Sequence, residues 1–247
     1  MSSRKQQGDV LIANAGFRDR YQLLLAEHLP PAMKAFAPFF ANVNRLETMS
    51  SLLARHVVRK IESKTIRILN AGSGAFAAEL FSAPFQNQDI TSFDYTEAFA
   101  GLYPVFRGEG LLRTTTFSRA DANTVVYPAG KFDLIVFHDI FYETALDIPA
   151  MLGRFQVFLR PGGYLYLDFM SQGTGWLWRV LGRGKAYKRY AMTGVQGALF
   201  ANDFEILELK PSGGVSNPIV GVLNRILWAA FRTSNAYAII ARKKVAA

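Results

Sequence analysis

Apolar positions recur with helical spacing in the first part of this chain. Residues 21–29 predict a helix that Pro30 and Pro31 end, and a second apolar stretch covers residues 33–40. A later helix carries Leu46, Met49, Leu53 and Val57 on one face. We therefore expect a helical N-terminal cap over residues 1–62.

After residue 62, short apolar runs alternate with segments of helical character. The expected strands lie at residues 66–70, 89–94, 114–117, 133–138, 163–169, 203–209 and 236–242. Alternation of this kind predicts a mainly parallel sheet that helices cover on both faces. The sequence therefore indicates an α/β domain over residues 63–247.

Residues 171–200 form an insertion after the fifth expected strand. No acid lies between Asp168 and Asp203, and aromatic side chains are interspersed with Arg179, Arg183, Lys185, Lys188 and Arg189. This composition fits three interpretations: a solvated lid, a surface that binds an acidic substrate or an anionic membrane, or a surface that binds nucleic acid. We favour a lid that serves substrate capture or an anionic surface, and we do not expect nucleic acid as a partner.

Composition narrows the possible chemistry. The chain has 247 residues, of which 50% are hydrophobic, and a formal net charge of +9. It has no cysteine and only 3 scattered histidines, so we expect no disulfide, thiolate site or transition-metal site. The first ten residues lack the apolar stretch of a signal peptide, and no run reaches the roughly 18 apolar residues of a membrane span. We expect a soluble, cytoplasmic protein.

The first expected strand leads directly into a glycine-containing turn. Gly72 and Gly74 come after the strand, and helix-forming alanines come next. Glycine tolerates positive φ angles and lets a ligand approach the backbone, while a helix N-terminus aims unpaired N–H groups at the same place. A plain tight turn is the alternative, but the residues beyond the turn favour a nucleotide-like cofactor.

Asp94 ends the second expected strand, about 20 residues after the glycines, where a carboxylate usually accepts the hydroxyls of a ribose. Two cofactor classes share this arrangement. Gly72, Gly74 and Ala77 satisfy the dinucleotide fingerprint of an NAD-type oxidoreductase. The other class binds S-adenosylmethionine through a related glycine turn.

Later motifs favour the second class. Arg119–Ala122 comes after the third expected strand, and residues 131–139 and 155–168 contain the fourth and fifth. In this order and at this spacing, the chain resembles the class I S-adenosylmethionine-dependent methyltransferases of small-molecule type over about residues 66–170. The resemblance implies a Rossmann-like seven-stranded sheet, S-adenosylmethionine as the cofactor, and a substrate lid built by the insertion.

The resemblance also assigns cofactor-binding residues. They are Asn70, Ala71, Gly72, Ser73 and Gly74 at the methionine part, Asp94 at the ribose, Tyr95 beside it, Asp121 and Ala122 at the adenine, and His138 beside the methyl group. This chain departs from the family twice. Asn70 stands where an acid is usual and brings no charge opposite the cofactor's cationic groups. Phe76 replaces a third glycine and is expected to narrow the turn.

His138 and Asp139 are the candidate catalytic residues, because they lie just past the fourth strand at its carboxyl end. An imidazole can accept a proton from a hydroxyl or an amine. Consecutive residues rarely point the same way, so we do not expect these two to pair. The sequence predicts methyl transfer to oxygen or nitrogen of a small, largely apolar or aromatic biosynthetic molecule. A cyclisation or rearrangement on the same fold, a non-catalytic cofactor-binding subunit and a nucleic-acid-docking module are the alternatives.

Overall fold

The computed structural model of the chain describes residues 15–34, 37–40, 43–60, 65–81, 88–143, 145–174, 188–212, 218–231 and 233–245. Internal contacts divide the chain into two compact units, Met1–Val125 and Val126–Ala247. The expected division into a cap, residues 1–62, and a domain, residues 63–247, stays a prediction.

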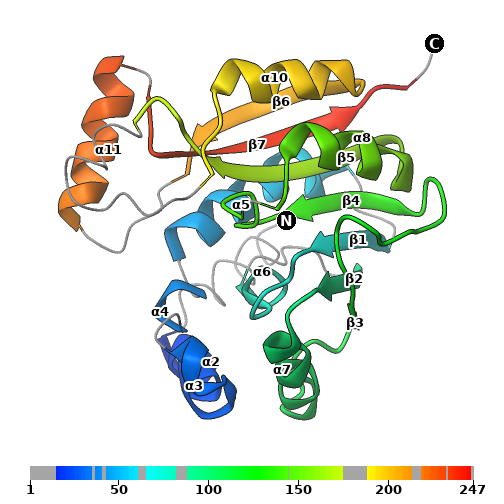
Figure 1. Ribbon diagram of the computed structural model, residues 1–247, viewed down its shortest axis with the longest axis vertical. Helices are drawn as coiled ribbons and strands as arrows, with labels where there is room; N and C mark the ends of the chain where they lie inside the picture. The colour runs from blue at the N-terminus through cyan, green and yellow to red at the C-terminus, as the bar shows by residue number, and fades with distance from the viewer. Residues whose placement is uncertain are drawn as a thin grey trace. The chain divides into compact units, whose positions relative to one another are not determined.

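Seven strands make one sheet, which Figure 1 labels. They are β1 (Ile66–Ala71), β2 (Gln88–Asp94), β3 (Thr115–Arg119), β4 (Phe132–Phe137), β5 (Leu159–Met170), β6 (Phe204–Pro211) and β7 (Ala236–Lys243). Their order is β3-β2-β1-β4-β5-β7-β6. The pairs β1/β2, β2/β3 and β4/β5 are parallel, whereas β7 runs antiparallel to β5 and β6. The expected α/β fold with a mainly parallel seven-stranded sheet is confirmed.

The first unit begins with helices, as the apolar spacing predicts. They are α2 (Ala15–His28), α3 (Pro31–Lys34), α4 (Ala37–Phe40), α5 (Val43–His56) and the 3₁₀ turn η1 (Val58–Lys60). Helix α2 ends before Pro30, and Pro31 opens α3, where the missing N–H of proline is tolerated. The predicted apolar face is buried: Leu46, Met49 and Leu53 lie on α5, and Val57 comes directly after its last residue.

Two helices connect the strands of the first unit. Helix α6 (Ala77–Phe81) comes after β1, and α7 (Glu97–Gly108) comes after β2. One face of α7 buries Phe99, Leu102 and Phe106. The strand–helix alternation read from the sequence is therefore present in this unit.

The second unit has a fully buried central strand. Every residue of β4 is buried, as expected of a parallel strand covered on both faces. Its helices are α8 (Ile148–Phe155), the 3₁₀ turn η2 (Gln156–Phe158), α10 (Met192–Ala201) and α11 (Pro218–Phe231). Helix α10 contacts both α8 and β6. None of the helices that the structure describes has the length and apolar character needed to cross a membrane.

Strand β5 begins earlier than the sequence predicts. It starts at Leu159 and not at residue 163, and residues 161–163 form an irregularity within it. Phe132 pairs with Leu159, but Leu134 pairs with Tyr164. Gly162 has a φ of 71°, and a Cβ at Gly163 would lie 2.9 Å from the carbonyl oxygen of Arg160. Glycines are required here because the extra residues bulge out of the ladder.

The expected lid insertion falls partly on residues 175–187, which lie outside the described part of the chain. Its two ends are described. Ser171 forms an isolated parallel bridge with Tyr190, and the last third of the insertion is helix α10. The role of residues 171–200 as a lid stays a prediction.

Candidate functional site

The glycine turn comes directly after β1, as predicted. Gly72 has a φ of 71° and Gly74 a φ of 53°, so both adopt the left-handed conformation that glycine favours. The N–H groups of Gly72 and Ser73 donate to the carbonyl oxygen of Phe93 at 3.0 and 2.9 Å. These bonds tie the turn to the last residues of β2.

Asp94 connects the same turn to the end of β2. Its Oδ2 accepts the N–H of Gly74 at 2.9 Å, and its Oδ1 accepts the N–H of Thr96 at 2.8 Å. Each carboxylate oxygen keeps a second lone pair, so a ligand hydroxyl can still bind. Asp94 therefore organises the turn whether or not a ligand is present, a role that the sequence did not reveal.

Asn70, at the position where the resemblance leads one to expect an acid, is a buried polar residue whose side chain has no hydrogen-bond partner among the described residues. Its side chain is 3% exposed, and neither Oδ1 nor Nδ2 has a hydrogen bond to the residues that the structure describes. The same holds for the hydroxyl of Ser73, which is also buried. A buried polar group left unpaired costs about 1 to 3 kcal/mol. An amide and a hydroxyl can supply donors and acceptors to a polar ligand, so these residues fit the amino-acid part of S-adenosylmethionine.

The remaining predicted cofactor residues of the first unit lie after β2 and β3. Tyr95 is 63% exposed, Asp121 is exposed and Ala122 is buried. The N–H of Ala120 donates to the carbonyl oxygen of Asp94 at 3.0 Å, which brings the loop after β3 beside Asp94. Oδ1 of Asp121 accepts the N–H of Asn123 at 2.8 Å, so this carboxylate shapes its own loop. Their roles toward a cofactor stay predictions.

Phe76 occupies the turn with a backbone that is unusual for a bulky residue. Its φ is 60°, and its side chain is completely buried. The ring packs edge-to-face against Phe117 at 5.2 Å and against Phe106 at 6.1 Å between centroids. The Phe76 side chain, which we expected to narrow the turn, thus packs in an aromatic cluster with residues of α7 and β3.

In the second unit, the structure gives His138 a partner. Nδ1 of His138 lies 2.8 Å from Oδ2 of Asp168, whose side chain is 0% exposed. The register pairs Phe137 with Leu167, so His138 and Asp168 come at the same level past β4 and on β5. The sequence motif contained Asp168, but only the pairing of the two strands shows that it meets the histidine.

Two further donors hold the Asp168 carboxylate. The hydroxyl of Tyr166 donates to its Oδ2 at 3.1 Å, and the N–H of Asp139 donates to its Oδ1 at 2.7 Å. Asp139 has a φ of 54° and offers its backbone to Asp168. Nδ1 of His138 lies close to this buried carboxylate, but the contact does not have the geometry of a hydrogen bond in the described residues. A proton on Nδ1 would leave Nε2 as the acceptor.

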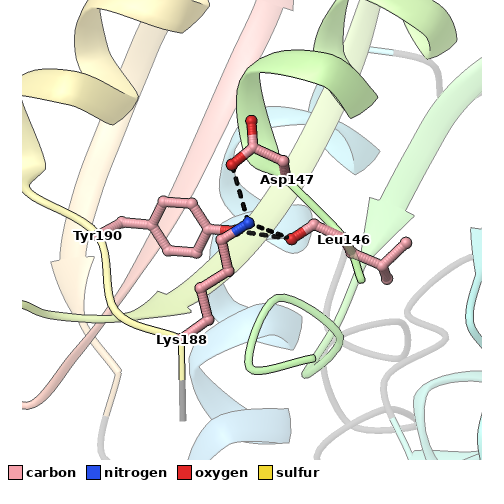
Figure 2. A network of polar contacts seen from close by, with 4 residues as sticks. All are labelled: Leu146, Asp147, Lys188 and Tyr190. Carbon is pink, nitrogen blue, oxygen red and sulfur yellow. Dashed lines mark hydrogen bonds and ion pairs between the residues drawn. The ribbon is translucent and has the colours of Figure 1, made fainter. Parts of the chain in front are cut away.

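Lys188, from the basic insertion, belongs to a polar network that holds the chain in place (Figure 2). Its Nζ donates to the carbonyl oxygen of Leu146 at 2.7 Å and to Oδ1 of Asp147 at 2.9 Å. Tyr190 donates its hydroxyl to the same carbonyl at 3.0 Å. Burial alone lowers the pKa of Lys188, but the hydrogen bonds with Asp147 and Tyr190 outweigh it and raise that pKa. Burial raises the pKa of Tyr190 as well.

Arg189 is also engaged by the protein. Its guanidinium donates to the carbonyl oxygen of Ser171 at 2.9 Å and to Oδ1 of Asn235 at 3.2 Å. Lys188 and Arg189 therefore fix the segment that returns from the insertion. In the described residues, no group of three or more His, Asp or Glu side chains is placed to hold a metal ion.

Comparison with known proteins rests on structure alone, because no protein-family model and no curated protein matches the chain. The magnesium protoporphyrin IX methyltransferase of Synechocystis, solved with bound S-adenosylhomocysteine, is 16% identical with a TM-score of 0.61, covering 96% of this chain and 97% of that one. A SAM-dependent methyltransferase of Methanosarcina mazei is 17% identical with a TM-score of 0.59, covering 78% and 99%. The chain has the class I methyltransferase fold.

This fold supports more than one reaction. The (4+2)-cyclase SpnF is 18% identical to the chain with a TM-score of 0.59, covering 83% of this chain and 82% of that one. Because a fold hosts many functions, the reaction has to be argued from the site.

Proposed function

We propose that this protein is an S-adenosylmethionine-dependent methyltransferase that methylates oxygen or nitrogen of a small, largely apolar or aromatic molecule. The observation that carries the proposal is the contact between His138 and the wholly buried Asp168. A histidine oriented by a buried carboxylate is suited to remove a proton from a hydroxyl or amine. Because the chain has the methyltransferase fold, we infer that this base acts in a methyl transfer.

Cofactor binding is assigned to the first unit. The side chains of Asn70 and Ser73, which make no hydrogen bond to the described residues, fit the amino-acid part of the cofactor. The carboxylate oxygens of Asp94, each of which accepts one backbone N–H, keep lone pairs that fit its ribose. The Synechocystis neighbour, solved with S-adenosylhomocysteine, supports the choice of cofactor. When bound, S-adenosylmethionine supplies an electrophilic methyl group.

We assign to the second unit the removal of a proton from the methyl acceptor. Nε2 of His138 takes the proton that the acceptor oxygen or nitrogen loses as it gains the methyl group. The carboxylate of Asp168 faces Nδ1 and stabilises the imidazolium that forms. General-base catalysis of this kind contributes about 10²- to 10⁴-fold to the rate, with positioning of the acceptor supplying the rest.

Calorimetric titration of the purified protein with S-adenosylmethionine, S-adenosylhomocysteine and NAD tests the cofactor. We expect the two sulfur compounds to bind and NAD not to bind. A panel of hydroxylated and aminated aromatic compounds, incubated with radiolabelled S-adenosylmethionine, then tests the reaction. Tight binding of NAD without response to either sulfur compound would overturn the proposal.

A second candidate is a cyclisation or rearrangement by the same chain, and the likeness to SpnF favours it. In that case the protein would bind the sulfur cofactors but form no S-adenosylhomocysteine from S-adenosylmethionine. Mass spectrometry separates the two candidates, because methylation adds one carbon and two hydrogens to the product, whereas an intramolecular cyclisation leaves its mass unchanged.

A further inference from the structure

The N-terminal helix α2 reaches the glycine turn through Tyr21. The side chain of Tyr21 is 1% exposed, and its hydroxyl donates to the carbonyl oxygen of Ala75 at 2.8 Å. Ala75 lies between Gly74 and Phe76, in the part of the turn that leads into α6. A residue 54 positions earlier in the chain thus holds the backbone of the turn.

The ring of Tyr21 supports the same turn by packing. It stacks on Phe106 of α7 with 5.7 Å between centroids and 19° between planes. Phe106 in turn packs edge-to-face on Phe76 at 6.1 Å. Phe76 keeps a φ of 60°, a strained conformation for a bulky residue that persists only where the surrounding structure fixes it. Tyr21 therefore contacts the turn directly at Ala75 and through one ring at Phe76.

The hydroxyl of Tyr21 remains a hydrogen-bond donor because it does not lose its proton. Burial, reinforced by the charge of Glu79, raises the pKa of Tyr21 well above its ordinary value, so the hydroxyl stays protonated. Helix α2 has a second attachment to the same unit, because Arg20 pairs with Glu109 at 2.7 Å. That pair is nearly half exposed and contributes little. Of these two contacts, the one made by the buried Tyr21 reaches the turn.

We propose that Tyr21 is a positioning residue that pre-forms the cofactor turn, so that docking of helix α2 and binding of the cofactor stabilise each other. The proposal rests on the proposed binding of S-adenosylmethionine or S-adenosylhomocysteine at this turn. A turn that is already ordered loses less conformational entropy when it binds a ligand. Because coupling of two equilibria is reciprocal, a ligand that favours the ordered turn also favours the docked helix.

Tyr21→Phe tests the proposal, because it removes one oxygen atom and keeps the stacked ring. Tyr103→Phe is the matched control. Tyr103 belongs to the same aromatic cluster, with its ring 5.9 Å from that of Phe76, and its hydroxyl also donates to a backbone carbonyl, that of Thr115 at 2.6 Å. Thr115 begins β3 and lies outside the turn. A general loss of stability would therefore appear in both variants.

Two measurements read the effect. Calorimetry gives the dissociation constant of S-adenosylhomocysteine, which we expect to rise about three- to tenfold in Tyr21→Phe, as for an ordinary hydrogen bond, and less than about twofold in Tyr103→Phe. Hydrogen–deuterium exchange reports the coupling. S-Adenosylhomocysteine should slow exchange in residues 15–28 of the parent and of Tyr103→Phe, but much less in Tyr21→Phe. Without ligand, residues 72–81 should exchange faster only in Tyr21→Phe.

Equal affinities and equal protection of α2 in the two variants would overturn the role of Tyr21 and leave the proposed function standing. A parent protein that binds neither S-adenosylmethionine nor S-adenosylhomocysteine would overturn both. Faster exchange in the turn of Tyr21→Phe together with unchanged affinity would show that Tyr21 holds the turn without influencing the ligand, and would also overturn the proposal.

Discussion

The carboxylate of Asp94 accepts the backbone N–H of Gly74 at 2.9 Å, and this hydrogen bond joins the end of β2 to the glycine turn. The other carboxylate oxygen accepts the N–H of Thr96 at 2.8 Å. The acid that the sequence assigns to a ribose is therefore also a structural link. Substitution of Asp94 should affect the protein even in the absence of ligand.

We expect Asp94→Ala to weaken binding of S-adenosylhomocysteine strongly and to lower the melting temperature of the ligand-free protein. Two backbone N–H groups lose a charged acceptor, and each such bond contributes about 1.5 to 3 kcal/mol. A loss of about 1 kcal/mol lowers the melting temperature of a protein of this size by about 2 to 4 °C. Asp89→Asn, at an exposed acid of the same strand, is the control for calorimetry and thermal unfolding. A parent-like melting temperature in Asp94→Ala would contradict the structural role.

Asp168→Asn should reduce turnover of an acceptor found by the panel of aromatic compounds by about 100-fold or more, within the range of general-base catalysis. The amide has no charge to stabilise an imidazolium and can hold the wrong tautomer of His138. Asp139→Asn should have a much smaller effect, because Asp139 offers its backbone N–H to Asp168, and asparagine tolerates a positive φ. Steady-state kinetics measures the turnover of both variants. Calorimetry measures their affinity for S-adenosylhomocysteine, which we expect to be unchanged. Equal losses in both variants would contradict the role given to the Asp168 carboxylate.

Asn70→Asp should raise the affinity for S-adenosylmethionine relative to S-adenosylhomocysteine by about three- to tenfold. A carboxylate attracts the sulfonium charge that only the first compound carries, whereas the present amide does not. Titration of the parent and the variant with both compounds gives the ratio directly. Gln172→Glu, at an exposed position, serves as the control. An unchanged ratio would place Asn70 away from the sulfur atom.

Lys188→Met should destabilise the protein by about 1 to 2 kcal/mol near neutral pH, because it removes two hydrogen bonds from a half-buried network. The pKa of Lys188 is raised on folding, so its stabilisation is complete below about pH 10.5 and is lost as the pH rises through the folded pKa. The raised pKa of Tyr190 acts in the same direction. Urea unfolding at several pH values should show the difference between parent and variant shrink only at alkaline pH. Lys34→Met, at an exposed lysine, should show no difference.

Arg183→Ala combined with Lys185→Ala tests the basic insertion without disturbing Lys188, which holds the chain. We expect the double variant to change acceptor turnover or association with anionic liposomes more than affinity for S-adenosylhomocysteine. The parent should bind duplex DNA and RNA only weakly at about 0.15 M salt, since a few phosphate contacts are easily screened. Submicromolar RNA binding by the parent that is lost in the double variant would instead favour a nucleic-acid function.

The sequence alone was sufficient for the strands and for the glycine turn. Strand positions can be read from short apolar runs, and these are local properties of the chain. Six of the seven strands begin within one residue of the predicted position, and the exception, β5, starts at Leu159 because glycines let a bulge stay inside the strand. The candidate cofactor residues could be named because Gly72, Gly74 and Asp94 lie at the ends of successive strands.

Only the tertiary structure decided which side chains act together. His138 meets Asp168 because Phe137 of β4 pairs with Leu167 of β5, and a shift of a single residue there would turn Asp168 to the other face. Tyr21 meets Ala75, and Lys188 meets Asp147, across 54 and 41 positions of the chain. Local propensity sets where a helix or strand forms. Contacts between distant residues depend on strand register and helix docking, which no short pattern in the sequence encodes.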